Sequence, residues 1–280
     1  MIANARMYSV SPETASLWRK LLAGVIEHAG LDIEVLEHTA PRPLDELWGR
    51  SDMAAVFMCG LPFSRAEPQP ALIAAPVPAP PEFRGRPEYW SEMVVRKDSP
   101  FERLEDTFGR RLALTVGGSQ SGCIAPLTLL RQTLAAEAGP ARANPVYDEV
   151  IGPEITPLAA LSAVVDGRAE VAPVDAYAFA LLQRYRRDLT AAVRSIARTR
   201  PTPIPPLVAS APGPEALRRA FLEAHRVDAL RPLMADLLLE RFVQPEPQAY
   251  DALRSNYENI TAYWREHALA RRIGPGFAHF

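Results

Sequence analysis

The residues of this chain with the clearest chemical potential form a run of glycines and hydroxyl-bearing residues at positions 117–122, with the sequence GGSQSG. This run follows an apolar segment of strand length at 111–116 and precedes a helical pattern at 126–138. Small residues let several backbone N–H groups point into one concavity, and the start of a helix adds a partial positive charge. The run therefore predicts a site for a small anion, with hydroxyl donors at Ser119 and Ser121, and a capped turn that binds nothing is the alternative.

The neighbouring positions Gln120 and Gly122 belong to the same candidate site, and four further candidates follow other predicted strands. In open α/β sheets, ligands bind beyond the carboxyl ends of the strands. These four are Tyr8, Cys59, Tyr89 and Asp175. The Asp175 carboxylate would either accept hydrogen bonds from a ligand or cap the helix that follows it. Each tyrosine is either a cleft aromatic or part of the core.

The residue types that carry catalysis do not gather in the sequence. The five histidines lie apart, and neither a Gly-x-Ser-x-Gly elbow nor a His-Glu-x-x-His motif is present. Cys59 and Cys123 lack metal-type spacing, and a disulfide between them is possible but not indicated. Cys123, near a helix start, is either an activated thiolate or a buried, inert thiol. We therefore expect a binding protein with no catalytic residues, no metal and no cofactor.

Composition excludes two classes of partner. The chain has 280 residues and a net charge of 31 − 33 = −2, without a block of like charges. Nucleic-acid-binding proteins usually carry a basic face, so nucleic acid is not an expected partner. No apolar run approaches the roughly 18 residues needed to cross a bilayer, so we expect no membrane insertion. Residues 1–10 do not read as a secretory leader, which leaves a cytosolic protein or a missing leader as alternatives.

Strands and helices alternate along the first half of the chain. The opening sixty residues predict strands at 5–10, around 33–35 and at 53–59, with a helix that Ser11 caps and Gly30 ends. Eight prolines between positions 62 and 87 then predict an extended border segment, in which any strand would be confined to an edge.

A second alternating unit begins with a strand at 89–96 and continues through strands at 111–116, 170–175 and 193–199. The remaining chain predicts helices at 217–225, 229–242 and 250–270 that cover one lobe. The expected fold is α/β, with two lobes joined by a two-strand hinge. Residues 1–90 with 206–280 would form lobe 1, and residues 91–205 would form lobe 2.

The order of several segments resembles a known family. The segments are AAVFMCGLPF at 54–63, YWSEMVVRKDSP at 89–100, LEDTFGRR at 104–111, SQSG at 119–122, AVVDGRAEVAPVD at 163–175, and the crossing from Arg198 to Val208. Their order and spacing resemble the substrate-binding proteins of phosphate, phosphite and phosphonate ABC transporters, which have the type II periplasmic-binding-protein fold.

This resemblance implies two lobes that close on a small anionic ligand. The Ser-x-Ser-Gly loop would bind the anionic headgroup, while Asp175, Tyr8 and Tyr89 would line the cleft. It also implies a periplasmic location and an ABC transporter permease as partner. Two alternatives stay open at this point: a cytosolic ligand sensor, and a biosynthetic enzyme on the same scaffold, of the thiamine-precursor or menaquinone type.

Overall fold

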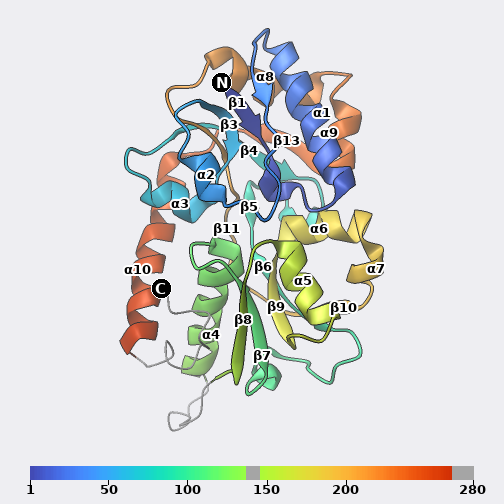
Figure 1. Cartoon of the computed structure of the whole chain (residues 1–280), viewed down its shortest axis with the longest axis vertical. Coiled ribbons are helices and arrows are strands. Elements are labelled where there is room, and N and C mark those ends of the chain that lie inside the picture. The colour runs from blue at the N-terminus through green and yellow to red at the C-terminus, as the bar shows by residue number, and fades with distance from the viewer. Residues whose placement is uncertain (137–145, 267–280) are drawn as a thin grey trace. The chain divides into compact units, whose positions relative to one another are not determined.

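The computed structural model describes residues 1–136 and 146–266 (Figure 1). The chain divides into two compact units. Unit 1 contains Met1–Tyr89 and Thr202–Ala252, and unit 2 contains Trp90–Pro201 and the chain from Leu253 onward. The chain leaves unit 1 after β5 (Glu88–Tyr89) and re-enters it at β11 (Thr202–Pro203), and these two strands pair antiparallel. The expected α/β fold with two units joined by a pair of strands is confirmed.

Unit 1 is built on a six-stranded sheet. In spatial order its strands are β13 (Leu239–Val243), β4 (Ala71–Pro78), β12 (Leu207–Ala209), β3 (Met53–Phe57), β1 (Ile2–Asn4) and β2 (Glu34–Val35). Strand β1 pairs parallel with both β2 and β3. Its helices are α1 (Pro12–His28), α2 (Leu44–Trp48), α3 (Gly60–Arg65), α8 (Glu215–Glu223) and α9 (Arg231–Asp236). The expected start of α1 is confirmed, because Ser11 and Thr14 form a reciprocal capping box.

Unit 2 is built on a five-stranded sheet. In spatial order its strands are β10 (Val193–Arg198), β6 (Ser91–Arg96), β9 (Val171–Asp175), β7 (Arg111–Thr115) and β8 (Glu149–Glu154). Strand β7 pairs parallel with both β8 and β9. Its helices are α4 (Ala125–Ala136), α5 (Pro157–Val165), α6 (Ala176–Tyr185), α7 (Arg187–Thr190) and most of α10 (Asp251–Glu266). Residues 137 and 138, which the sequence assigned to the helix after the glycine run, lie outside the described residues.

The first strand is shifted from its expected position. The strand expected at 5–10 is wrong, because β1 ends at Asn4 and Arg6–Tyr8 forms a short 3-10 helix. The Asn4 side chain accepts a hydrogen bond from the Arg6 backbone N–H at 2.8 Å, which turns the chain. The tyrosine at position 8 therefore belongs to this turn and not to a strand.

The proline-rich segment contains strand β4, which has a different partner strand along each of its halves. The sequence predicted an edge strand here. The first half of β4, Ala71–Ala74, pairs with β12, whereas its second half, Ala75–Pro78, pairs with β13. Pro76 and Pro78 lie in the second half, where only one side of the strand carries a partner. Because proline lacks the N–H of a ladder hydrogen bond, the local one-sided pairing explains how it is tolerated.

The expected helix at 229–242 is also corrected. Helix α9 ends at Asp236, Leu238 adopts a left-handed conformation with φ of 54°, and β13 follows. The leucines of this segment are compatible with a helix or a strand, and pairing with the open side of β4 stabilises residues 239–243 as a strand.

The last helix differs from the expected division into lobes. The sequence placed all of 206–280 in lobe 1, whereas α10 from Leu253 belongs to unit 2. Within unit 2, Asn256 of α10 donates from Nδ2 to Thr128 Oγ1 of α4 at 3.1 Å. The sequence shows the apolar stripe of this helix but not the surface that the stripe covers.

Candidate functional site

The topology of unit 2 makes the carboxyl end of β7 the candidate ligand site of this unit. The chain runs from β7 through α4 to β8 on one side, then through α5 to β9 on the other side. The carboxyl end of β7 is therefore a topological switch point, where open α/β sheets bind their ligands. Thr115 is the last residue of β7, and the glycine and serine run follows it directly.

The run at 117–122 ends in a helix start with unusual geometry. Residues Gln120–Ile124 form a single π turn that continues into α4, with Ser119 as the N-cap. The Ser119 Oγ accepts from Gly122 N at 3.0 Å, and its carbonyl oxygen accepts from Ile124 N at 3.1 Å. Gln120, Ser121 and Gly122, expected in a loop, are therefore the first residues of the helix.

Several hydrogen-bond donors at this helix start are available to a ligand. The first N–H groups of a helix have no acceptor within the helix. Those of Gln120 and Ser121 have no acceptor among the described residues either. The Ser119 hydroxyl keeps its proton for donation, because its oxygen only accepts from Gly122. Together these groups and the helix dipole favour an oxyanion.

Thr115 and Gly122 form the floor of the site. The Thr115 side chain is 6% exposed, and its Oγ1 has no hydrogen-bond partner among the described residues. A Cβ built on Gly122 would lie 1.8 Å from this Oγ1, so only glycine lets the helix start approach the strand. Buried polar groups in proteins normally have a partner, and an unpartnered hydroxyl at a helix start is a place where a bound ligand would supply one.

Two further strands bring Asp175 to the same edge of the sheet. Ser91, at the start of β6, pairs with Asp175 at the end of β9. The buried Ser91 Oγ donates to the Ser121 carbonyl oxygen at 2.6 Å. Asp175 and the helix start therefore share Ser91 as a neighbour. The Asp175 Oδ1 accepts from Ala178 N at 2.9 Å, which is the capping alternative in place.

Thr115 and Ser91 are site residues that sequence reasoning missed. Each is a polar residue within an otherwise apolar strand, and both are buried. Thr115 could have been recognised from the sequence, because it is a polar residue beside the predicted glycine-rich turn. Ser91 carries no comparable signal, because its role depends on the pairing of β6 with β9.

The Gln120 side chain is buried, whereas a residue of a surface loop would be exposed. The Gln120 side chain is 1% exposed, and its Oε1 has no hydrogen-bond partner in the described part of the chain. A buried amide oxygen normally accepts a hydrogen bond, so this one is a buried acceptor left unsatisfied within the described residues.

The three candidates of unit 1 occupy buried positions. The Tyr8 ring, 1% exposed, packs edge-on against Phe57 at 5.2 Å. Cys59 is the N-cap of α3 and is 5% exposed. Tyr89, 1% exposed, pairs with Thr202 in the ladder between β5 and β11. The tyrosines lie among core residues, and a role in ligand binding for these three residues stays a prediction.

Cys123 follows the capping turn, and its environment decides between the two roles expected for it. Its thiol is completely buried in the π turn, and burial raises its pKa. A thiolate is therefore disfavoured at this position despite the adjacent helix start. Cys59 and Cys123 are both buried thiols.

In residues 1–136 and 146–266, no group of three or more histidine, cysteine, aspartate or glutamate side chains is arranged to hold a metal ion. None of the helices described is both long enough and apolar enough to cross a membrane.

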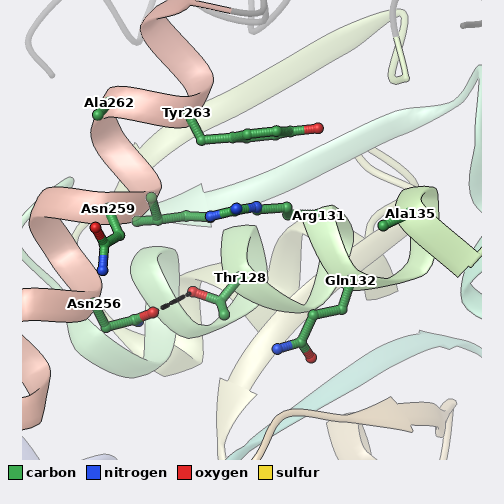
Figure 2. Close-up of a pocket in the computed structure, with 9 residues that line it drawn as sticks. Thr128, Arg131, Gln132, Ala135, Asn256, Asn259, Ala262 and Tyr263 are labelled. Atoms are coloured by element: carbon green, nitrogen blue, oxygen red, sulfur yellow. Dashed lines mark hydrogen bonds between the residues drawn. The ribbon is translucent and has the colours of Figure 1, made fainter.

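Unit 2 contains a groove between α4 and α10, of about 850 Å³ (Figure 2). The guanidinium of Arg131 lies 4.5 Å from the centre of the Tyr263 ring. The rest of the lining is Thr128, Gln132, Ala135, Asn256, Asn259, Ile260 and Ala262. Because the only cation in this lining already contacts an aromatic ring, the groove offers less to an anion than the end of β7 does.

Two α/β units, each with its strands in the order 2-1-3 around a switch point, define the type II periplasmic-binding-protein class. The chain belongs to the family of periplasmic substrate-binding proteins of phosphonate ABC transporters, because the family's sequence model matches residues 8–250. The resemblance seen in the sequence and the solute-binding role are thus confirmed. Members of this family are periplasmic proteins that serve as the substrate-binding components of ABC transporters.

Solved structures show the same fold at low sequence identity. A binding protein of a phosphonate ABC transporter from Pseudomonas aeruginosa has a TM-score of 0.72 and 16% identity, over 98% of this chain and 89% of that chain. PhnD1 from Prochlorococcus marinus, solved with methylphosphonate, has a TM-score of 0.73 and 14% identity, over 93% and 97%. XAC2383 from Xanthomonas citri, solved with ATP, has a TM-score of 0.59 and 20% identity, over 95% and 98%. No curated protein sequence matches the chain.

Proposed function

We propose that this protein binds a small phosphonate or a related oxyanion at the carboxyl end of β7 and delivers it to an ABC transporter permease in the periplasm. The observation that carries the proposal is the helix start at Ser119–Gly122. There, two N–H groups and the Thr115 hydroxyl, which have no hydrogen-bond partner among the residues described, come together with the Ser119 hydroxyl.

The chemistry of this site favours binding without a chemical step. A catalyst for acyl or phosphoryl transfer needs an activated nucleophile or a positioned base. The buried Cys123 thiol next to the site has a raised pKa, and the serine hydroxyls there act as donors. Membership of the family, which serves transport, supports the same conclusion.

A thermal-shift screen of oxyanions tests the proposal directly. A ligand at about 100 times its dissociation constant stabilises the folded state by roughly 2.7 kcal/mol. For a protein of this size we expect Tm to rise by about 5–10 °C with at least one of phosphate, phosphite, alkylphosphonates, sulfonates or carboxylates. An unchanged Tm with every compound would overturn the proposal.

Asp175 is expected to contact the ligand in addition to capping α6. The change Asp175→Asn should weaken binding of the ligand found in the screen by about tenfold or more, because a hydrogen bond to a charged group contributes about 1.5–3 kcal/mol. Asparagine caps helices as well as aspartate does, so Tm without ligand should be unchanged. Isothermal titration calorimetry measures the affinity, and an affinity equal to that of the parent would leave Asp175 as a cap alone.

A further inference from the structure

The π turn before α4 is closed by hydrogen bonds of unusual span. Ile124 N donates to the Ser119 carbonyl oxygen at 3.1 Å, and Ala125 N donates to the Gln120 carbonyl oxygen. Both bonds join residues five positions apart, whereas the bonds of an α-helix join residues four positions apart. Single π turns of this kind are frequent at functional sites.

A proline interrupts this series of bonds at its next step. The next acceptor in the series is the Ser121 carbonyl oxygen, and the next donor would be the N–H group of residue 126. Residue 126 is proline, which has no backbone N–H group. The π turn can therefore be completed only by a donor from outside the helix.

Ser91 supplies this missing donor. Its Oγ donates to the Ser121 carbonyl oxygen at 2.6 Å. Ser91 is the first residue of β6 and is completely buried. Because a serine hydroxyl has a single proton, that proton is committed to the carbonyl oxygen. A side chain from a neighbouring strand thus takes the place of the N–H group that Pro126 lacks.

The backbone of Ser91 is fixed on both sides. On one side, Ser91 N donates to Thr199 Oγ1 at 2.9 Å, and Thr199 N donates to the Ser91 carbonyl oxygen at 3.1 Å. On the other side, Ser91 pairs with Asp175 of β9, and Ala176 N donates to the Trp90 carbonyl oxygen at 2.9 Å. The Ser91 hydroxyl therefore has a defined position, and it defines the position of the Ser121 carbonyl oxygen.

The peptide group that joins Ser121 to Gly122 is consequently held at both ends. Its carbonyl oxygen accepts from Ser91, and its N–H group donates to Ser119 Oγ at 3.0 Å. Because Ser119 Oγ accepts this bond, its own proton remains available to a ligand. Rotation of the peptide group would remove the Gly122 N–H from Ser119 and leave the Ser119 hydroxyl without a fixed orientation.

We propose that Ser91 is a positioning residue of the oxyanion site. Its hydroxyl holds the π turn in the form in which the Ser119 hydroxyl and the N–H groups of Gln120 and Ser121 are presented together to the anion. Ser91 acts through the Ser121 carbonyl oxygen and does not bind the anion itself. The role of Ser91 in binding rests on the proposed function, whereas its role in holding the turn does not.

Hydrogen exchange measured by NMR in the absence of any oxyanion tests whether Ser91 holds the turn. In Ser91→Ala, the amides of Ile124 and Ala125 should exchange about tenfold faster than in the parent, because one hydrogen bond that fixes the turn is lost. Unchanged exchange of both amides would overturn the proposal.

Thr107→Val is the matched control. The Thr107 hydroxyl is also completely buried in unit 2, and it also donates to a backbone carbonyl oxygen, that of Leu104, at 2.6 Å. Both variants should therefore lose stability. In Thr107→Val, however, the amides of Ile124 and Ala125 should exchange as in the parent. Equal acceleration in the two variants would reduce Ser91 to a general contribution to stability and overturn the proposal.

Calorimetric titration with inorganic phosphate and ethylphosphonate tests the consequence for binding. Ser91→Ala should bind the oxyanion about tenfold more weakly than the parent, whereas Thr107→Val should bind like the parent. Equal affinity of Ser91→Ala and the parent would overturn the positioning role. If the parent bound no oxyanion of the screen, the proposed function would fail, and hydrogen exchange would still show whether Ser91 holds the turn.

Discussion

The paired change Ser119→Ala/Ser121→Ala is expected to weaken oxyanion binding by more than a hundredfold. Each hydroxyl would donate a hydrogen bond to a charged ligand, and such bonds contribute about 1.5–3 kcal/mol each. Their joint loss corresponds to about 3–6 kcal/mol, at 1.4 kcal/mol for each factor of ten. The fold should survive, because loss of the Ser119 cap costs only about 1 kcal/mol.

Calorimetric titration with the ligand identified by the thermal-shift screen measures this effect. The variant Ser99→Ala is a suitable control, because Ser99 lies in unit 2 and its hydroxyl donates to the Arg96 carbonyl oxygen. It should bind like the parent. If the double variant retained the affinity of the parent, the helix start would be a capped turn without a ligand role.

The second large effect is expected from Gly122→Ala. The added Cβ would lie 1.8 Å from Thr115 Oγ1 and 2.7 Å from two carbon atoms of the same side chain. Thr115 belongs to a buried strand and cannot withdraw, so the helix start must move away from β7. We expect ligand binding to fall about a hundredfold, the loss expected when two charge-assisted bonds are broken. Crowding in a packed interior should lower the free energy of unfolding by about 1–3 kcal/mol.

Gly118→Ala is the matched control for this change. A Cβ at Gly118 meets no atom within 4 Å, so the same substitution four residues earlier should leave both stability and binding unchanged. Chemical denaturation and calorimetry of the two variants give the comparison. Binding by Gly122→Ala equal to that of Gly118→Ala would show that the close approach of the helix start to Thr115 is not needed for the ligand.

The two units share a topology, and this explains why each has a polar strand end. In each unit, the first strand of a β-α-β-α-β segment is flanked by the second and the third. The connections therefore diverge at its carboxyl end and leave backbone and side-chain groups exposed to a ligand. Unit 2 places hydroxyl and N–H donors at this position, whereas β1 of unit 1 ends at the buried amide of Asn4.

Local patterns in the sequence were sufficient for most elements. Ser11 and Pro12 predict the start of α1, and the apolar run at 53–59 predicts the buried strand β3. The glycine and serine run predicts a helix start with anion donors, because small residues and a cap act over a few neighbouring positions. Asp175 is likewise recognisable as a residue between a strand and a helix.

Other features depend on contacts between distant segments, and only the tertiary structure decides them. Residues 239–243 become a strand because β4 has an open side, and the prolines of β4 are tolerated because that half of the strand has a single partner. Thr115 requires glycine at position 122, and Ser91 joins the site through its pairing with Asp175. The sequence by itself determines the two α/β units and the capped helix start at which we expect an anion, since periodicity and capping are local. The neighbourhood of Ser91, Asp175 and the helix start follows from strand pairing, which joins residues far apart in the chain.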